Sequence, residues 1–175
     1  MRLLEEREDA DLSLRELARA VGVSATAVYR HFPDKEALRG ALAQAAYDRL
    51  GEAQRAAATE YDDVGEQFQA MGRTYVRFAL DHPALFRLMS SIAPHDDLFD
   101  LGAEDDDAAA RLLRAYALRL AGEGASVDVA RTIAVRAWAL VHGLAVLMLD
   151  GYVPRDEALI DAVVDTRQLG LTGRR

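Results

Sequence analysis

The chain has 175 residues, a formal net charge of -8 and no cysteine. That length supports one or two small domains with a real core, and the missing cysteine excludes a disulfide framework and a thiolate metal site. No segment reaches the roughly 18 consecutive apolar residues that span a bilayer, and the start, MRLLEERED, lacks the apolar core of a signal peptide. The many Ala, Leu and Val residues favour helix over strand, so we expect an all-α protein. A cytoplasmic protein is the simplest interpretation of a chain without cysteine.

Residues 12–38 predict two short helices joined by a tight turn. Ser13 followed by Glu16 is a capping box, which starts a helix. Gly22 permits the positive φ that ends this helix, and Ser24 caps the next one. Such a helix-turn-helix places the start of its second helix in the major groove of DNA.

The side chains of this segment suit a DNA surface. Residues 14–40 hold five Lys or Arg and three acids, a local charge of +2 that leaves -10 for the rest of the chain. Lys35, the only lysine, lies in the first turn of a further helix, where the N-terminus already favours phosphate. Small, hydroxyl and basic side chains meet phosphates and base edges, so the predicted DNA contacts are Arg15, Ser24, Ala25, Thr26, Tyr29, Arg30, His31 and Lys35.

The remainder of the chain predicts longer helices. Apolar side chains spaced by four and three residues form one stripe of a long helix: Val64, Phe68, Met71, Tyr75 and Phe78. A second stripe comprises Leu112, Leu113, Tyr116 and Leu120, and a last packing face comprises Leu159, Ile160, Val163 and Val164. Residues 133–149 are apolar over more than half of the helix circumference, so this helix is central or shared with a partner subunit.

An acidic stretch, residues 90–107, separates two of these helices. It holds seven acids and no Lys or Arg. We expect a solvated loop that leads into a helix whose first turn favours acids; the alternative is a metal site formed by His95, Asp96 and Asp97. No metal or cofactor is expected on the first interpretation.

Aromatic and methionine side chains are the candidate walls of a small-molecule pocket, although plain core packing predicts the same spacing. Tyr75 and His142 each need a polar partner if they are buried. A catalytic function is not expected, since the four histidines are scattered and no nucleophile-base frame or phosphate loop is present. The candidate walls are Phe68, Met71, Tyr75, Phe78, Phe86, Met89, Tyr116, Trp138 and His142.

The segment LSLRELARAVGVSATAVYRHFPDKEAL, residues 12–38, closely resembles the DNA-binding region of TetR-family transcriptional regulators. The shared pattern places Gly-Val-Ser at residues 22–24 and Tyr-x-x-Phe-x-x-Lys at residues 29–35. HPALFRLMSS, from His82, resembles the helix after the first long regulatory helix of many members. RAWALVHGLAVLMLDG, from Arg136, resembles the subgroup with a Trp-His-Gly signature, here Trp138, His142 and Gly143.

The resemblance implies a three-helix DNA-binding domain, residues 1–45, followed by a larger ligand-binding and dimerisation domain, residues 46–175. It implies a homodimer that binds a palindromic DNA operator as a repressor and is released by a small molecule. The last two helices, about residues 127–170, would form a four-helix bundle with those of the partner, through Leu140, Leu144, Ile160 and Val164.

Two features depart from the family pattern. Most of the first helix is missing before Leu3, so we expect an added upstream basic helix to raise stability and operator affinity. Thr26 and Ala27 stand in the reverse of the usual order, whereas Tyr29 and Lys35 match the pattern directly. The alternative function is therefore a helical small-molecule-binding protein with impaired DNA binding.

Overall fold

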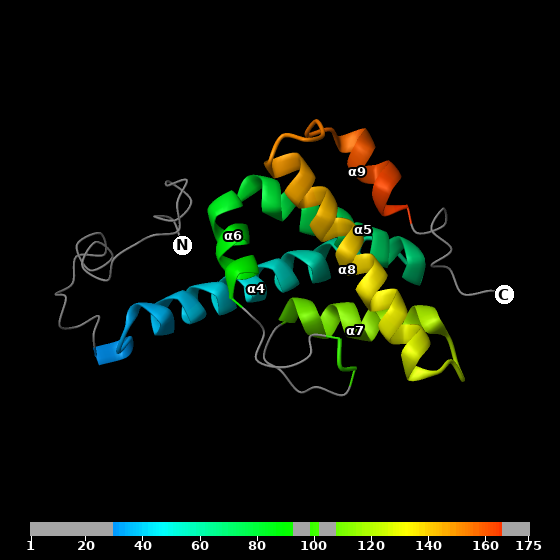
Figure 1. Ribbon diagram of the computed structural model, residues 1–175. Coiled ribbons are helices and arrows are strands. Elements are labelled where there is room, and N and C mark those ends of the chain that lie inside the picture. The colour runs from blue at the N-terminus through cyan, green and yellow to red at the C-terminus, as the bar shows by residue number, and fades with distance from the viewer. Residues whose placement is uncertain (1–29, 93–98, 102–107, 166–175) are drawn as a thin grey trace. The chain divides into compact units, whose positions relative to one another are not determined.

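The computed structural model describes residues 30–92, 99–101 and 108–165, and all regular structure within these ranges is helical. This confirms the predicted all-α class. Most of the predicted helix-turn-helix falls within residues 1–29, which lie outside the described residues. The helices, shown in Figure 1, are α4 (Lys35–Ala58), α5 (Val64–Asp81), α6 (Pro83–Ser91), α7 (Ala108–Ala121), α8 (Val127–Leu149) and α9 (Glu157–Val164).

Acidic and hydroxyl side chains begin several of these helices. Asp34 Oδ1 accepts a hydrogen bond from the Ala37 amide at 2.8 Å, directly before α4, and Asp156 Oδ1 accepts one from the Leu159 amide at 2.8 Å in α9. Side-chain acceptors of this kind satisfy amides that have no partner within the helix. Residue 83 is a proline in the first turn of α6, where its missing amide proton costs nothing.

The chain forms two compact units. One comprises residues 1–47 and 82–93, and the other comprises residues 48–81 and 94–175. The chain passes between them three times: within α4, between α5 and α6, and after residue 93. The predicted functional division at residues 45 and 46 stays a prediction.

In the first unit, two polar contacts join α6 to the first half of α4. Arg39 Nη2 donates a hydrogen bond to Ser91 Oγ at 2.9 Å, and Tyr47 Oη donates one to the Met89 carbonyl at 3.3 Å. Arg39 and Tyr47 lie eight residues apart, so they project from similar faces of α4. The last turn of α6 is therefore held to α4 at two points along α4, Arg39 and Tyr47.

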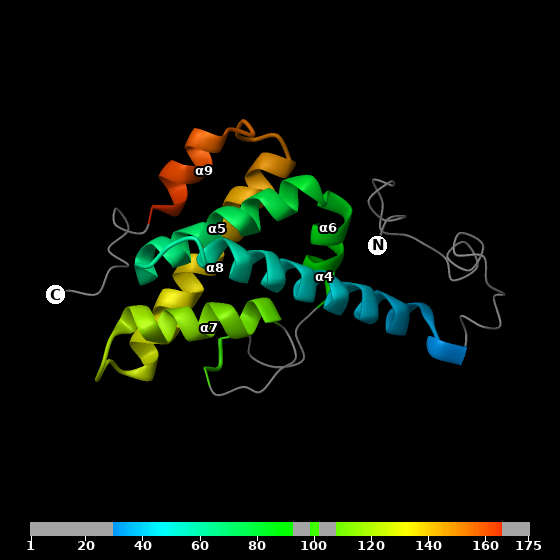
Figure 2. The same cartoon turned by 180° about the vertical axis from the view of Figure 1, so that it is seen from behind.

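In the second unit, α8 lies at the centre and packs against α5, α7 and α9. Figure 2 shows α5 and α7 from the side opposite to Figure 1, with α8 crossing behind them. We call the first of two apolar groups the core cluster; its buried members are Ala58, Phe68, Met71, Ala117, Leu120, Ile133, Ala134 and Ala137. A second group joins α5, α8 and α9 through Val76, Val141, Leu144, Met148, Ile160 and Val164.

The second half of α4 approaches the start of α7 very closely. A Cβ atom added to Gly51 would lie 2.7 Å from the Ala108 Cβ and 2.9 Å from two backbone atoms of Ala108 and Ala109. Only a residue without a side chain allows this approach.

Three polar contacts join α5 to α9 at four-residue intervals, in antiparallel order. The hydrogen bond to Glu157 raises the pKa of the Arg77 guanidinium. Both partners of that pair are about half exposed or more, so the contacts fix the register of α9 more than they stabilise it. The pairs are Gln69 with Asp165 (3.5 Å), Arg73 with Asp161 (3.7 Å) and Arg77 with Glu157 (2.6 Å).

The predicted helical stripes are largely confirmed, but the prediction that Leu144, Ile160 and Val164 face a partner subunit is wrong. Leu140, the fourth predicted member, is half-buried. Phe68, Met71 and Phe78 are buried on α5 as expected. Leu144, Ile160 and Val164, which were expected to face a partner subunit, are 6%, 0% and 3% exposed within the single chain. The apolar pattern alone could not distinguish the intrachain side of α8 from its outer side.

One described helix, α8, is long and apolar enough by length and composition to cross a membrane, although charged residues interrupt its apolar run. Core helices of water-soluble proteins pass the same test. Eight side chains of α8 are buried within the chain, as expected of a central core helix.

Candidate functional site

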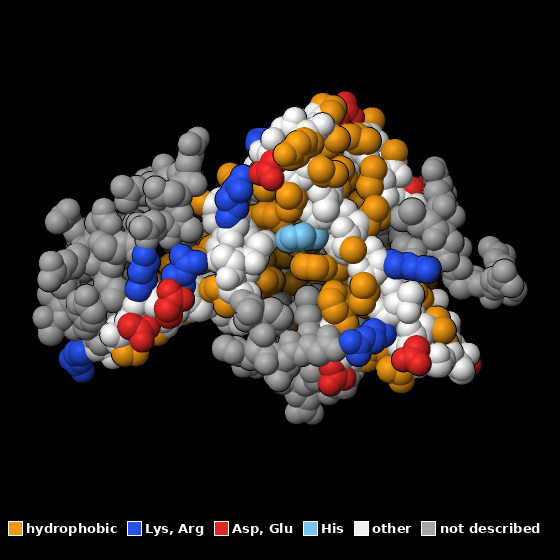
Figure 3. Space-filling model, viewed as in Figure 1, with side chains coloured by type: hydrophobic (Ala, Val, Ile, Leu, Met, Phe, Trp, Pro, Cys, Tyr) orange, Lys and Arg blue, Asp and Glu red, His pale blue; other side chains and the backbone are white. Residues whose placement is uncertain are grey.

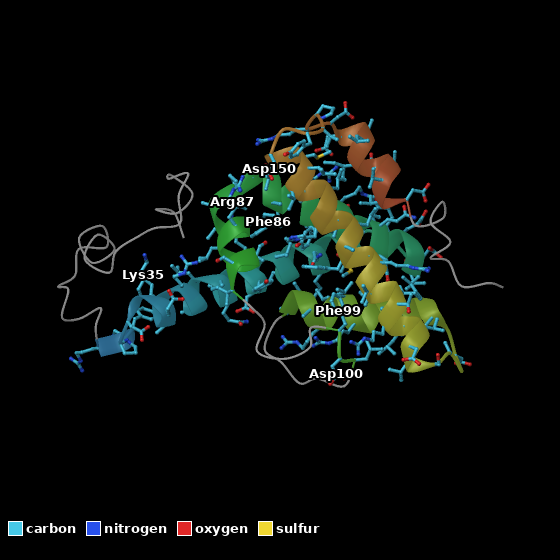
Figure 4. All side chains as sticks on the ribbon, in the orientation of Figure 1. Lys35, Phe86, Arg87, Phe99, Asp100 and Asp150 are labelled. Atoms are coloured by element: carbon cyan, nitrogen blue, oxygen red, sulfur yellow. The ribbon has the colours of Figure 1, made fainter. Side chains whose placement is uncertain are left out.

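The predicted DNA contacts fall mostly before the described residues. Arg15, Ser24, Ala25, Thr26 and Tyr29 lie outside them. Arg30 and His31 are described, helical and exposed. Lys35 is the first residue of α4 and is half-buried (Figure 4).

A second candidate site consists of four aromatic side chains in the second unit, which we call the aromatic cluster: Tyr75, Phe99, Trp138 and His142. Trp138 and His142 are four residues apart on α8, so they lie on one face, and their rings stack with centroids 4.5 Å apart and planes at 17°. Phe99 meets Trp138 edge-on at 5.9 Å. Tyr75, on α5, is the fourth member, and its ring centroid lies 6.3 Å from that of His142.

Two polar atoms of this cluster form a hydrogen bond with each other. Tyr75 Oη and His142 Nδ1 are 2.9 Å apart, a hydrogen bond whose donor depends on the imidazole tautomer. Burial alone lowers the pKa of the His142 imidazole below its ordinary value of 6.5. The His142 imidazole is therefore neutral at pH 7 and supplies a polar atom without net charge.

The core cluster adjoins the aromatic cluster. Phe68 and Tyr116 stack at 6.3 Å with planes at 16°, and the Arg119 guanidinium lies 4.7 Å from the Tyr116 ring centre. Phe99 packs against the core cluster as well as against Trp138, and Figure 4 shows it beside α7. The two groups therefore form one continuous aromatic and apolar region.

The structure brings together only part of the predicted pocket. Phe68, Met71, Tyr116, Tyr75, Trp138 and His142 lie in the connected region just described, and Phe78 is buried on α5. Phe86 and Met89 are buried on α6, in the first unit. The candidate metal ligands His95, Asp96 and Asp97 lie outside the described residues.

Two residues of this region were missed by the sequence analysis. Phe99 was assigned to an acidic loop, where its few apolar neighbours formed no periodic pattern. Gln54 is 7% exposed and donates a hydrogen bond from Nε2 to the Met71 carbonyl at 3.2 Å. Its burial leaves no trace in the sequence, since glutamine is ordinary on an exposed helix face.

Two features are now established separately: a helix that begins at Lys35, and an aromatic and apolar region in the second unit. Residues 1–42 match the family described as bacterial regulatory proteins, tetR family, and residues 68–167 match the tetracyclin repressor-like C-terminal domain. The chain therefore belongs to the TetR family of transcriptional regulators, as the sequence predicted. This class also confirms the expectation that the protein is not an enzyme.

Individual relatives agree with this assignment. An uncharacterized HTH-type transcriptional regulator of Mycobacterium tuberculosis is 30% identical over 93 residues, 53% of this chain. The matched part spans 46% of that relative, so the chain aligns with about half the length of the curated relatives it matches.

Solved structures share the fold. A protein of unknown function from Rhodococcus sp. RHA1 is 33% identical, with a TM-score of 0.69 over 97% of this chain and 92% of that one. A TetR family transcription regulator from Marinobacter aquaeolei VT8 has the same TM-score at 20% identity, covering 99% and 91% of the two chains. The second likeness supports the fold alone.

Proposed function

We propose that this protein is a ligand-responsive repressor that binds a palindromic DNA operator as a homodimer in the cytoplasm and leaves it when a small molecule binds. The observation that carries the proposal is the position of Lys35. It opens α4 directly after Asp34, within the segment that matches the regulatory family. A helix N-terminus and an ammonium group together favour a phosphate oxygen.

The test is operator binding by two variants of α4 that lose the same charge. Lys35→Ala should weaken binding to DNA flanking its own gene and lower the slope of log affinity against log salt by about one unit. Arg55→Ala, in the last turn of the same helix, should change neither. Equal effects of the two variants would show that only net charge matters, and the proposed surface would be wrong.

We propose that the outer face of α8 forms the dimer contact. Leu147 is 43% exposed there, Val129 is 47% exposed and Val135 is 39% exposed. Figure 3 shows hydrophobic side chains gathered on the face that carries α8 and α9. Gly143, between these positions, has nothing within 4 Å of an added Cβ, which leaves room for a second helix to approach.

A charge on this face tests the dimer. Leu147→Glu should give monomers in sedimentation, because a carboxylate would be buried at the subunit contact. Leu118→Glu is the matched control, since Leu118 is 45% exposed on α7. A dimer that persists in Leu147→Glu would place the contact elsewhere.

We propose that α5 and α6 connect effector binding to the DNA-binding segment. Tyr75 lies on α5, and α6 follows α5 after His82 alone. The contacts of Arg39 with Ser91 and of Tyr47 with Met89 hold α6 to α4, whose first residue is Lys35. An effector that binds one position of α5 more tightly than another would thereby shift the population of DNA-binding dimers.

A further inference from the structure

Gln54 is a buried polar side chain, and only one of its two polar side-chain atoms has a hydrogen-bond partner. Its Nε2 donates to the Met71 carbonyl at 3.2 Å, and its Oε1 has no hydrogen-bond partner among the described residues. The orientation of the amide is fixed by that bond, since exchanging the two atoms would place Oε1 against another acceptor. A buried acceptor is therefore left without a donor.

This acceptor lies beside the core cluster. Ala58 is one helical turn after Gln54 on the same face of α4 and is a buried member of that cluster, together with Phe68 and Met71. A buried acceptor without a donor is unfavourable, and native proteins retain few of them. The same site would gain stability from any molecule that supplies the missing donor.

We infer that Gln54 determines the specificity of the effector site, and that the effector is a largely apolar ring compound that donates one hydrogen bond to Gln54 Oε1. This inference rests on the proposed function, because it assigns a chemical class to the small molecule proposed there. The core cluster around Phe68 and Tyr116, whose rings stack with centroids 6.3 Å apart, is the kind of apolar and aromatic environment that such a compound requires. A ligand without a donor would leave the acceptor buried and unpaired, which a polar site penalises strongly.

Indole and benzothiophene form a matched pair of probes, since they share size and shape but only indole has an N–H donor. Calorimetric titration of the protein without DNA should give about tenfold tighter binding for indole, from the hydrogen bond to a buried acceptor. Gln54→Leu removes the acceptor, so it should bind the two probes within about twofold of each other. Equal binding of both probes by the unmodified protein, or no indole binding at millimolar concentration, would overturn the inference.

Gln67→Leu is the control variant. Gln67 also donates from Nε2 to a backbone carbonyl, that of Tyr61 at 2.7 Å, and its Oε1 also has no partner among the described residues. It is half-buried rather than buried, and its bond anchors it to the α4–α5 connection. This variant should keep the preference for indole; equal loss in Gln54→Leu and Gln67→Leu would show a general effect of disturbing the core.

Stability separates a specificity role from a structural one. Gln54→Leu, and Gln54→Met as a second variant of similar length, should unfold at a denaturant concentration no lower than the unmodified chain, because each removes an unpaired buried acceptor. If either variant folds and still binds indole about tenfold more tightly than benzothiophene, the inference is overturned. Indole binding that leaves operator affinity unchanged would refute the proposed release from DNA, but not the role of Gln54. Operator binding by a protein that does not distinguish the two probes would refute the role of Gln54, but not the proposed repressor.

Discussion

Replacing Gly51 by alanine tests the close approach of α4 to α7. An alanine in a helix interior normally stabilises it by about 0.5–1 kcal/mol relative to glycine, because the unfolded chain loses less freedom. At Gly51 the new methyl would lie 2.7 Å from the Ala108 Cβ and 2.9 Å from backbone atoms. Since carbon atoms attract best at about 3.5–4.0 Å, two backbones must separate by several tenths of an ångström or more.

Overpacking of this kind costs about 1–3 kcal/mol, so it exceeds the gain in helix propensity. The net expectation for Gly51→Ala is a loss of up to about 2 kcal/mol, which corresponds to a fall in melting temperature of roughly 4–8 °C at most. Gly40 is the control, because it lies in the same helix and an added Cβ there meets nothing within 4 Å. Gly40→Ala should gain about 0.5–1 kcal/mol.

Denaturant unfolding of the two variants, followed by far-ultraviolet circular dichroism, makes the comparison. The free energies of unfolding should differ by about 1–3 kcal/mol, with opposite signs relative to the unmodified chain. If Gly51→Ala is as stable as Gly40→Ala, then α4 and α7 are far enough apart to accept a side chain at position 51.

Two further predictions concern a helix cap and pH. Asp156→Ala should destabilise the chain by about 1 kcal/mol through loss of the 2.8 Å bond to the Leu159 amide, and Ser126→Ala should cost less in the same unfolding assay, since its bond to the Val129 amide is 3.4 Å long; equal costs would contradict the geometric ranking. Because burial lowers the folded pKa of His142, the unfolded chain takes up a proton first as pH falls below 6.5, so stability should decline from that pH downwards to the folded pKa. His142→Leu should lose this part of the pH slope, and an unchanged slope would show that other groups produce it.

Much of the fold follows from local patterns in the sequence. The stripe through Phe68, Met71 and Phe78 predicts the buried face of α5 because the helical period places these residues on one side. The motif around Lys35 similarly predicted both the family and the start of a helix after Asp34. Such signals need only neighbours within a few turns of one helix.

The arrangement of the site was decided by tertiary structure. Leu144 was expected at a subunit contact, but α8 is apolar around most of its circumference, and only the positions of α5, α7 and α9 determine which side lies within the chain. The hydrogen bond between Tyr75 and His142 joins residues 67 positions apart, and the bond from Gln54 to Met71 joins two helices. Periodicity assigns a residue to a face of its own helix, but the partner of that face depends on packing between helices that are distant in sequence.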